Sequence, residues 1–519
     1  MLLLLIALIS TLKYVAHTKL KNKNLPPEVA GAWPILGHLP ILDGQTIPLA
    51  RILAGWADKY GPVFSIRLGI PRYMVVSSWE AVRDCFTGND KVFAARPDAL
   101  AGKYLGYNNA RFSFSSYGPY WRKIRKLVVV ELLSSRRLEK LKQYRIAEME
   151  SSIKELYSSV VSGDGNSPPV VDLDQWIGQL TLNLILKTIA GKRFRYKADD
   201  DGAEHEEAQH IINTLKKFFV LVGKTALWDA VPFPLFKWVD FDGHINAMKR
   251  LHREVDDILQ GWIDEHVQRR KSRSGPGDDR DFIDVMLSAI DDEFTGGHGY
   301  SRETIIKATV LSMILDGSDT TALHLVWLFS MMLNHGHTIK RAQEEIDAKI
   351  GRNRWVEESD IDNLPYLKAV IKESLRLYPP APLLVPHEAV EDCYVAGYRV
   401  PKGTRLIVNA WKLHRDPRFW PEPEKFMPDR FLSTQAKLDA SGAHFEYVPF
   451  GSGRRSCPGI TYATLVAHVT VARLLQGFDF ATPGNEAVDL SEDVGVTMPK
   501  AKPLQVVITP RFTQEFYGF

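Results

Sequence analysis

The chain has 519 residues, of which 45% are hydrophobic and 24% charged, a composition typical of a folded protein with a large core. Three cysteines in this length exclude a disulfide-rich secreted domain. The 65 Lys and Arg residues nearly balance the 62 Asp and Glu residues, for a formal net charge of +3. This balance argues against a protein that coats nucleic acid.

The first 12 residues are apolar except for Ser10 and Thr11, and lysines follow from Lys13 onward. This order predicts an N-terminal membrane anchor over residues 1–24, with its basic flank on the cytosolic side and membrane lipid as its partner. The run is short, since a bilayer core requires about 20 residues. A cleaved signal peptide is the alternative, but Tyr14 stands where a cleavage site requires a small residue.

Residues 25–40 are rich in proline, which predicts a stiff hinge, and residues 41–519 read as one domain. Helical periodicity dominates that domain, so the fold class is mainly α with a small β portion. Short strands are predicted over 73–77 and 394–400. The predicted helices cover 138–157, 245–269, 303–333 and 339–350, and the polar tract 269–280 is predicted to be a surface loop.

The most informative segment is Phe450 to Gly459, which precedes an apolar run over 460–478. It contains two glycines before Cys457 and a third two residues after it. Glycine lets the backbone turn tightly, and a helix that begins just after Cys457 directs the positive end of its dipole at the sulfur. Such surroundings stabilise a thiolate and let N–H groups approach a sulfur that ligates a planar macrocycle. A structural cysteine on a turn is the alternative for a lone Cys.

The segment resembles the F-x-x-G-x-R-x-C-x-G signature of the cytochrome P-450 superfamily, which it matches at Phe450, Gly453, Arg455, Cys457 and Gly459. The resemblance implies that fold, a haem b cofactor with Cys457 as iron ligand, and a monooxygenase reaction. It runs from residue 33 to the C-terminus and is similar to plant microsomal members. Residues 227–240 resemble a branch with nicotine N-demethylase and alkaloid hydroxylases, which also contains terpenoid and phenolic enzymes.

Three further residues resemble a conserved charged group of that superfamily. Glu373 and Arg376 match its E-x-x-R pattern, and Arg430 matches the arginine of its P-E-R-F segment. Residues three apart lie on one face of a helix, so Glu373 can bind Arg376 while Arg430 completes a buried structural triad. The E-x-x-R pattern alone is common on surface helices. It supports the resemblance here only because the cysteine segment follows it in the chain.

Within the predicted helix 303–333, residues 316–321 resemble the oxygen-activation motif of the superfamily. Gly317 is expected to weaken the helix near the haem, while Asp319 and Thr320 are the expected catalytic pair that delivers protons to dioxygen. The alternative is a group of Ser and Thr hydroxyls that bond to the preceding turn. Asp316 stands where the superfamily has Ala or Gly, so it could bind a protonated amine, share a proton with Asp319 or point away.

Cofactor contacts are expected from four residues, because haem propionates require cations and hydrogen-bond donors. By resemblance these are Trp121, Arg125, His387 and Arg455. Trp121 and Arg125 share one helix face at i,i+4 spacing, whereas His387 could also be an ordinary loop histidine. The substrate contacts expected by resemblance are Phe114, Leu315, Asp316, Leu384 and Thr497. Most are apolar, which suits a small hydrophobic substrate, although each could equally be core packing.

The sequence has no G-x-G-x-x-G or Walker loop, so it shows no reductant site of its own. The resemblance implies a membrane-bound flavoprotein reductase that passes on electrons from NADPH, with Arg122, Lys123 and Lys126 as a candidate docking patch. It also implies an endoplasmic reticulum location with a cytosolic domain. The expected reaction is hydroxylation, oxidative demethylation or cyclisation of a plant specialised metabolite, an alkaloid first and a terpenoid or phenolic as the alternative.

The sequence is also compatible with two other functions. A haem-thiolate isomerase or dehydratase would rearrange a peroxide without a reductase, and the Asp319 and Thr320 pair argues against it. A haem protein that only binds ligands would show no reductase-dependent oxygen consumption. Nothing in the sequence favours this second reading.

Overall fold

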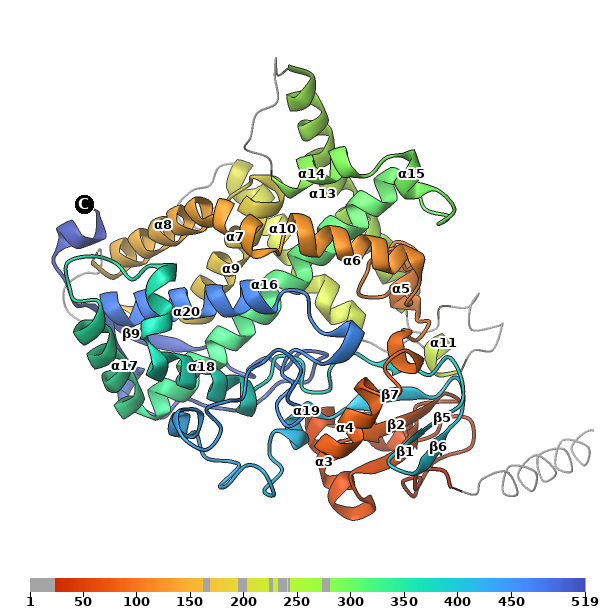
Figure 1. Ribbon diagram of the computed structural model, residues 1–519. Coiled ribbons are helices and arrows are strands. Elements are labelled where there is room, and N and C mark those ends of the chain that lie inside the picture. Colours follow the sequence, from red (N-terminus) through yellow and green to blue (C-terminus); the bar gives the residue numbers. More distant parts are fainter. Residues whose placement is uncertain are drawn as a thin grey trace, which may run out of the picture.

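The computed structural model describes residues 24–161, 169–194, 203–223, 227–231, 240, 243–272 and 281–518. Helices form most of this body, and several strands gather at the lower right of Figure 1, which confirms the mainly α class with a small β portion. The α-helices are α2 (Leu39–Leu42), α3 (Leu49–Tyr60), α4 (Trp79–Phe86), α5 (Leu100–Tyr104), α6 (Pro119–Glu131), α7 (Ser135–Lys140), α8 (Lys142–Val161), α9 (Leu173–Ala190), α10 (Ala203–Gly223), α11 (Leu227–Ala230), α13 (His244–Ser272), α14 (Phe282–Ala289), α15 (Asp292–Thr295), α16 (Arg302–Asn334), α17 (Gly336–Lys349), α18 (Pro365–Leu377), α19 (Ala410–Leu413) and α20 (Ile460–Gly477).

The strands and the 3₁₀ helices are all short, with at most six residues each. The strands are β1 (Val63–Arg67), β2 (Arg72–Val76), β3 (Val170–Asp172), β4 (His387–Glu388), β5 (Cys393–Val395), β6 (Tyr398–Val400), β7 (Arg405–Val408), β8 (Phe478–Ala481) and β9 (Gln505–Pro510). The 3₁₀ helices are η1 (Val92–Ala94), η2 (Glu358–Asn363), η3 (Pro428–Leu432), η4 (Gly453–Arg455), η5 (Pro483–Asn485) and η6 (Gln514–Tyr517).

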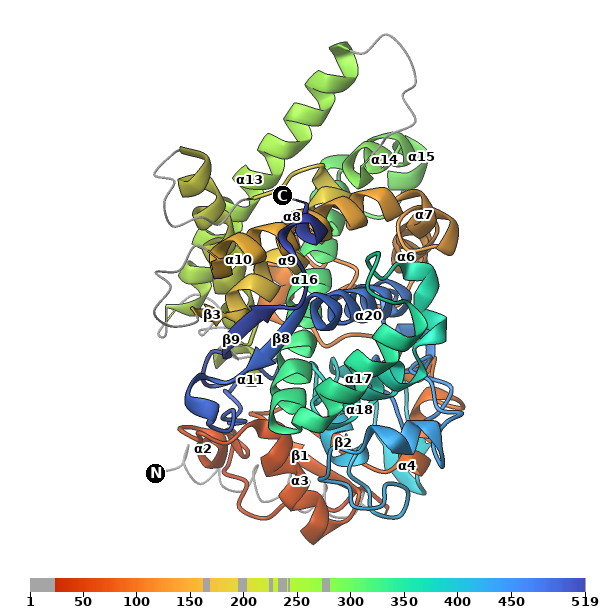
Figure 2. The same cartoon turned by 90° about the vertical axis from the view of Figure 1, so that its left-hand side faces the viewer.

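Helix α16 passes through the middle of the molecule, with α9, α18 and α20 packed against it (Figures 1 and 2). It begins at Arg302 and is capped by Ser301, whose side chain accepts a hydrogen bond from the Thr304 N–H group. It ends at Asn334, just before Gly336. Because α16 is apolar on nearly all faces, it is buried along most of its length and forms the central support of the core.

The largest sheet has four strands, in the order β1-β2-β7-β4. Strand β2 pairs antiparallel with β1 and parallel with β7, in a register that places Tyr73 opposite Arg405. Strand β4 then pairs antiparallel with β7 and carries His387. The sheet therefore joins the N-terminal part of the chain to the segment that precedes the cysteine loop.

Strands β5 and β6 form a hairpin over the predicted strand region 394–400. Its two central turn residues, Ala396 and Gly397, both have positive φ, as a tight hairpin turn requires. A second sheet, with the order β3-β9-β8, lies across the front of Figure 2 and ties the C-terminus to the helical body. Both sheets are small, so their role is to fix loops and helix ends.

The predicted helices are present, with one correction. The predicted helix 138–157 is divided into α7 and α8, because Leu141 ends α7 with ψ near 1° and turns its N–H group back to Arg137. The helices predicted over 245–269, 303–333 and 339–350 correspond to α13, α16 and α17. The predicted loop 269–280 is helical through Ser272, and its remaining residues lie outside the described part of the chain.

The predicted anchor lies outside the described residues except for Asn24. Among the helices that are described, none is both long enough and apolar enough to span a bilayer. The predicted hinge over 25–40 contacts the main sheet, since the Val29 N–H group donates to Ser65 O at 3.0 Å and His38 is fully buried. Its function as a hinge stays a prediction.

Candidate functional site

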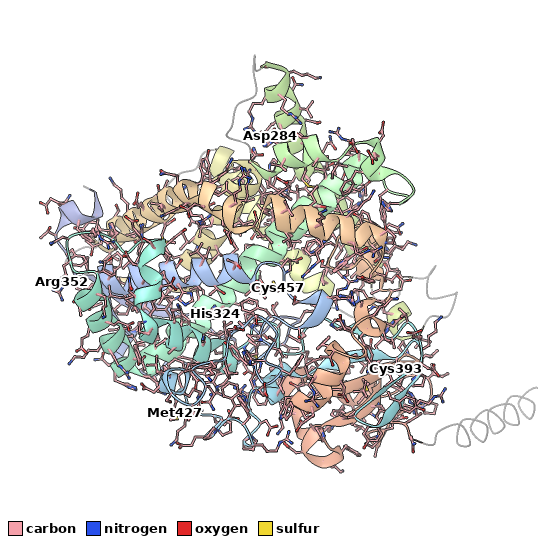
Figure 3. The ribbon with its side chains drawn as sticks, viewed as in Figure 1. Asp284, His324, Arg352, Cys393, Met427 and Cys457 are labelled. Carbon is pink, nitrogen blue, oxygen red and sulfur yellow. The ribbon has the colours of Figure 1, made fainter. Side chains whose placement is uncertain are left out.

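The loop that carries Cys457 lies near the centre of the view in Figure 3, between α16 and the sheet region. Its backbone turns through Gly451 and Gly453, which both have positive φ. A side chain at Gly453 would place its Cβ 2.3 Å from Asp90 Oδ1, so this position requires glycine. The Cys457 N–H group donates to Phe450 O at 2.9 Å and closes the loop.

The Cys457 sulfur accepts a hydrogen bond from the Gly459 N–H group at 3.3 Å, and α20 begins directly after it. Burial raises the pKa of the Cys457 thiol, while the Gly459 N–H group and the nearby Arg125 guanidinium act in the opposite direction. Cys85 and Cys393 differ, because both are buried among apolar residues at the sheet. Cys457 is therefore the thiol with the surroundings of a metal ligand.

Three arginines lie around this loop. Arg125 on α6 donates to Ser456 O at 2.6 Å, and Arg455 donates to Ala94 O at 2.7 Å. Arg96, which follows η1, donates to two loop carbonyls, Val385 O at 2.9 Å and Pro386 O at 2.7 Å. Each guanidinium is thus fixed by main-chain carbonyl groups from a different part of the chain.

Trp121 supports two of these arginines. Its ring lies 4.4 Å from the Arg455 guanidinium carbon and 5.2 Å from that of Arg125, and its Nε1 donates to Phe112 O at 3.1 Å. The i,i+4 spacing of Trp121 and Arg125 on α6 produces the shared face that the sequence predicts. The same tryptophan therefore orients two cations at once.

No carboxylate in the described part of the chain lies within 4 Å of Arg96, Arg125 or Arg455. Burial lowers the pKa of Arg96 to about 9. Burial also lowers the pKa of Arg455 to about 8, and repulsion from Arg96 and Arg125 adds to this effect. Cations in such a position are stabilised by an anion of more than one charge, which is what the two propionates of a haem supply.

His387 lies in the same group of residues. Its Nδ1 hydrogen-bonds Phe93 O at 2.7 Å, and its ring lies 5.2 Å from that of Phe86. Burial holds the pKa of His387 well below its usual range, and the charges of Arg96 and Arg455 lower it further. The imidazole is therefore neutral, and it is buried beside the cations that would bind the propionates.

Asp319 and Thr320 lie on α16. Asp319 Oδ2 is buried without a hydrogen-bond partner among the described residues. Burial raises the pKa of Asp319 to about 6, and the negative charge of Asp316 adds to the rise. The Thr320 hydroxyl donates to Asp316 O at 2.8 Å, which is the bond to the preceding turn that the alternative interpretation predicts. This bond leaves the lone pairs of Thr320 Oγ1 free to accept another proton donor.

Gly317 lies within α16 where this helix packs against α9. Helix α16 continues through this residue without interruption. A Cβ at Gly317 would lie 2.9 Å from Ile185 Cδ1 on α9, so glycine allows the close contact of the two helices. The expected weakening of the helix at Gly317 stays a prediction.

Asp316 does not face the site as a free carboxylate. Its Oδ1 accepts a hydrogen bond from Arg111 Nη2 at 2.9 Å, and the Arg111 side chain is 3% exposed. Arg111 also donates through Nε to Ser312 Oγ at 3.2 Å, one turn earlier on α16. The Asp316 carboxylate therefore has a cationic partner within the protein itself.

Glu373, Arg376 and Arg430 form the predicted triad. Both carboxylate oxygens of Glu373 accept from Arg376, at 2.7 and 2.9 Å, and Arg430 Nε donates to Oε1 at 3.0 Å. Arg376 also donates to His414 O and Pro423 O, and it is fully buried. The triad is a completed hydrogen-bond network that joins α18 to the segment before the cysteine loop.

The remaining predicted substrate residues lie on several elements. Leu315 is fully buried on α16, and Phe114 stacks against the Arg111 guanidinium at 5.2 Å. Leu384 has positive φ and packs beside the sheet core. Thr497 precedes Met498, whose N–H group bonds to Pro380 O.

Sequence reasoning missed Arg96 and Arg111. Each is a charged residue within an apolar or aromatic run, since Arg96 follows Phe93-Ala94-Ala95 and Arg111 stands between Ala110 and Phe112. A cation in such a run is a signal for a buried partner. The partner itself cannot be read from the sequence, because it lies hundreds of residues away.

Comparison with known proteins places this site in a family. The family model described as Cytochrome P450 matches residues 26–507. A nicotine N-demethylase from Nicotiana tomentosiformis is 51% identical over 96% of this chain and 94% of its own length. Vinorine hydroxylase from Rauvolfia serpentina is 49% identical and xanthotoxin 5-hydroxylase from Arabidopsis thaliana is 48% identical, over 96% and 95% of this chain and 93% and 94% of their own lengths.

A solved structure supports the same assignment. A zebrafish cytochrome P450 determined with progesterone has a TM-score of 0.74 and 26% identity, and the match covers 89% of this chain and all of that one. The chain belongs to the cytochrome P450 family and is a monooxygenase whose cofactor is haem b.

Proposed function

We propose that this monooxygenase oxidises a C–H bond of a hydrophobic plant specialised metabolite, and that the metabolite is an alkaloid. The likeness to nicotine N-demethylase and vinorine hydroxylase, which spans nearly the whole chain, carries this proposal. The product is a hydroxylated, N-demethylated or ring-closed compound. A terpenoid is a less favoured substrate, because none of the relatives described above is named for one.

When bound, the haem activates dioxygen with electrons from a separate reductase. We assign Cys457 as its ligand and Arg96, Arg125, His387 and Arg455, with Trp121 behind them, as the residues that hold its propionates. On α16, Asp319 Oδ2 can take up and release a proton near neutral pH, since the pKa of Asp319 is about 6. The Thr320 hydroxyl accepts and passes on that proton. Leu315, Phe114, Leu384 and Thr497 are the proposed substrate contacts.

The protein partner that we propose is an NADPH-dependent flavoprotein reductase in the endoplasmic reticulum membrane. Helix α6 directs Trp121 and Arg125 into the molecule and leaves Arg122, Lys123 and Lys126 exposed. This exposed basic face suits an acidic surface of the reductase. Residues 1–24 are the proposed anchor, which would hold the domain on the cytosolic side of the membrane.

The test is turnover with the reductase, NADPH and ¹⁸O₂ in the presence of amines, terpenoids and phenolics. An alkaloid product that gains one labelled oxygen, or loses a methyl group as labelled formaldehyde, would support the proposal. Conversion of a peroxide without reductase would indicate an isomerase or dehydratase. Reversible ligand binding without reductase-dependent oxygen consumption would indicate a carrier.

The Arg111–Asp316 ion pair favours a second substrate class, uncharged aromatic compounds. Because Arg111 neutralises Asp316, an uncharged aromatic compound meets no isolated charge at this point of the site. Xanthotoxin 5-hydroxylase, at 48% identity, is named for such a substrate. Hydroxylation of a furanocoumarin in the same assay, without reaction of any alkaloid, would favour this class.

A further inference from the structure

Arg111 is held by contacts from three elements. Its Nη2 and Nε groups donate to Asp316 Oδ1 and Ser312 Oγ on α16, at 2.9 and 3.2 Å. Its guanidinium carbon lies 5.2 Å from the ring of Phe114 in its own loop and 5.0 Å from that of Phe218 on α10. Two aromatic faces and two hydrogen bonds leave this cation little freedom to move.

The two members of the ion pair differ in exposure. The Arg111 side chain is 3% exposed, whereas the Asp316 side chain is 40% exposed. Although the Asp316 side chain is partly exposed, the protein atoms packed around it desolvate the carboxylate and raise the pKa of Asp316, while the Arg111 charge and hydrogen bond oppose that rise. The carboxylate therefore borders accessible space while its charge is compensated from the buried side.

The pair belongs to the reaction site. The charge of Asp316 acts on both Cys457 and Asp319, and its carbonyl oxygen accepts from the Thr320 hydroxyl. The other titratable groups that act on this region are Lys216 on α10, which opposes the rise in the pKa of Asp319, and the Tyr107 phenol beside Arg111. A molecule bound beside α16 thus meets an ion pair of zero net charge.

We propose that Arg111 is a specificity-determining residue, which cancels the charge of Asp316 so that the enzyme binds uncharged substrates, or the unprotonated form of an amine. Without Arg111, the Asp316 carboxylate selects a cation. Without Asp316, Arg111 selects an anion. The inference rests on the proposed function, since the substrate must bind beside α16, and it narrows the substrate class to electrically neutral molecules.

Three probes of the same shape test the proposal on the haem-loaded full chain. Trimethylphenylammonium, tert-butylbenzene and benzenesulfonate carry charges of +1, 0 and −1 on a phenyl ring with a tetrahedral group. Dissociation constants are measured from the spectral shift of the ferric haem and independently by equilibrium dialysis. The wild type is expected to bind tert-butylbenzene about tenfold or more tightly than either ion.

Variants give reciprocal expectations. Arg111→Met is expected to gain about tenfold in affinity for trimethylphenylammonium, and Asp316→Asn about tenfold for benzenesulfonate. The double variant should prefer the neutral probe again, and Arg111→Lys, which keeps the charge, should resemble the wild type. Because the Asp316→Asn and double variants contain no unpaired carboxylate, they test the proposal even if Arg111→Met does not fold.

The proposal would be overturned if the wild type bound the ammonium probe as well as tert-butylbenzene, or if neither single variant changed its charge preference. The carbon monoxide difference spectrum of each reduced variant separates this failure from that of the proposed function. A normal thiolate band with unchanged charge preference refutes the role of Arg111 alone. A missing band in the wild type refutes the ligation by Cys457.

Discussion

Two groups of arginines, one buried and one half-buried, differ in how their charges are balanced. In the triad, Arg376 and Arg430 share the carboxylate of Glu373, and every bond stays within the protein. Around the cysteine loop, Arg96, Arg125 and Arg455 bond only to main-chain carbonyls among the described residues. The first group is charge-balanced by the protein itself, whereas the second fits the propionates that we assign to it.

The difference is visible in the pKa values. Repulsion from Arg96 and Arg125 adds to burial and lowers the pKa of Arg455 to about 8. Arg430 also has a lowered pKa because of burial, but the Glu373 carboxylate counteracts that effect. In the triad a carboxylate thus offsets the effect of burial on the guanidinium pKa, whereas at Arg455 the neighbouring arginines add to it.

The largest expected effect is that of Glu373→Gln. The change leaves the two guanidiniums of Arg376 and Arg430 buried without a counter-charge, which costs about 3–5 kcal/mol in the free energy of unfolding. Urea unfolding of the haem-loaded protein measures this loss in the free energy of unfolding. The variant is also expected to give a low yield of folded protein. A loss of less than about 1 kcal/mol would show that the triad is not a structural support.

The next effect is that of Arg455→Met on haem retention. Transfer of haem to excess apomyoglobin is expected to become about 10- to 100-fold faster, because one charge that holds a propionate is lost. In the haem-free protein the same change should not reduce stability, since it removes repulsion between cations. Arg454→Met is the matched control, because the neighbouring Arg454 is exposed and paired with Asp90 at 2.8 Å. Equal haem loss in both variants would contradict the assignment.

Asp319 extends the comparison to a carboxylate whose buried Oδ2 has no hydrogen-bond partner among the described residues. Its pKa is about 6 in the folded protein against 3.8 in the unfolded chain, so the folded state binds the proton more tightly. Ionisation of Asp319 therefore lowers stability as pH rises from about 4 to about 6, and the whole cost is present above that window. Asp319→Asn removes this cost.

Asp319→Asn is expected to raise the free energy of unfolding by about 1–3 kcal/mol at pH 7.5, and by less at pH 5. It should at the same time reduce the yield of product per NADPH consumed. Urea unfolding at the two pH values, with product and NADPH measured in parallel, tests both expectations. A gain that is the same at both pH values would show that the Asp319 charge is not its cause.

The smallest effect is expected at the surface. Arg341 and Asp429 form an ion pair at 2.9 Å whose side chains are 47% and 60% exposed. Asp429→Asn is expected to change the free energy of unfolding by less than about 1 kcal/mol, because water and salt screen exposed charges. The same urea titration as for Glu373→Gln measures it. If Asp429→Asn and Glu373→Gln lowered the free energy of unfolding by similar amounts, burial would not explain the difference between the two ion pairs.

The sequence allows prediction of features whose partners lie close along the chain. The cysteine loop, the i,i+3 contact of Glu373 with Arg376 and the i,i+4 contact of Trp121 with Arg125 are of this kind. Helix periodicity likewise predicts α13, α16 and α17. In these cases local geometry determines the contact.

Contacts between distant parts of the chain could not be predicted. The Arg111 bond to Asp316 joins residues 205 apart, and the Arg96 bond to Val385 joins residues 289 apart. No spacing rule connects such pairs. The sequence shows that Asp316 stands at an unusual position. Whether its charge is balanced depends on Arg111, and only the folded structure shows that Arg111 lies beside it.

The parallel pairing of β2 with β7 joins residues 332 apart and has a consequence for biosynthesis. A ribosome must synthesise some 400 residues before β7 is available to the four-stranded sheet. Until then, one edge of β2 has no strand to pair with. Cys457 emerges later still, after Arg96 and Arg125. A chain that ends before residue 405 therefore cannot close this sheet, and a chain that ends between residues 408 and 457 can close it but lacks the cysteine that we assign as the haem ligand.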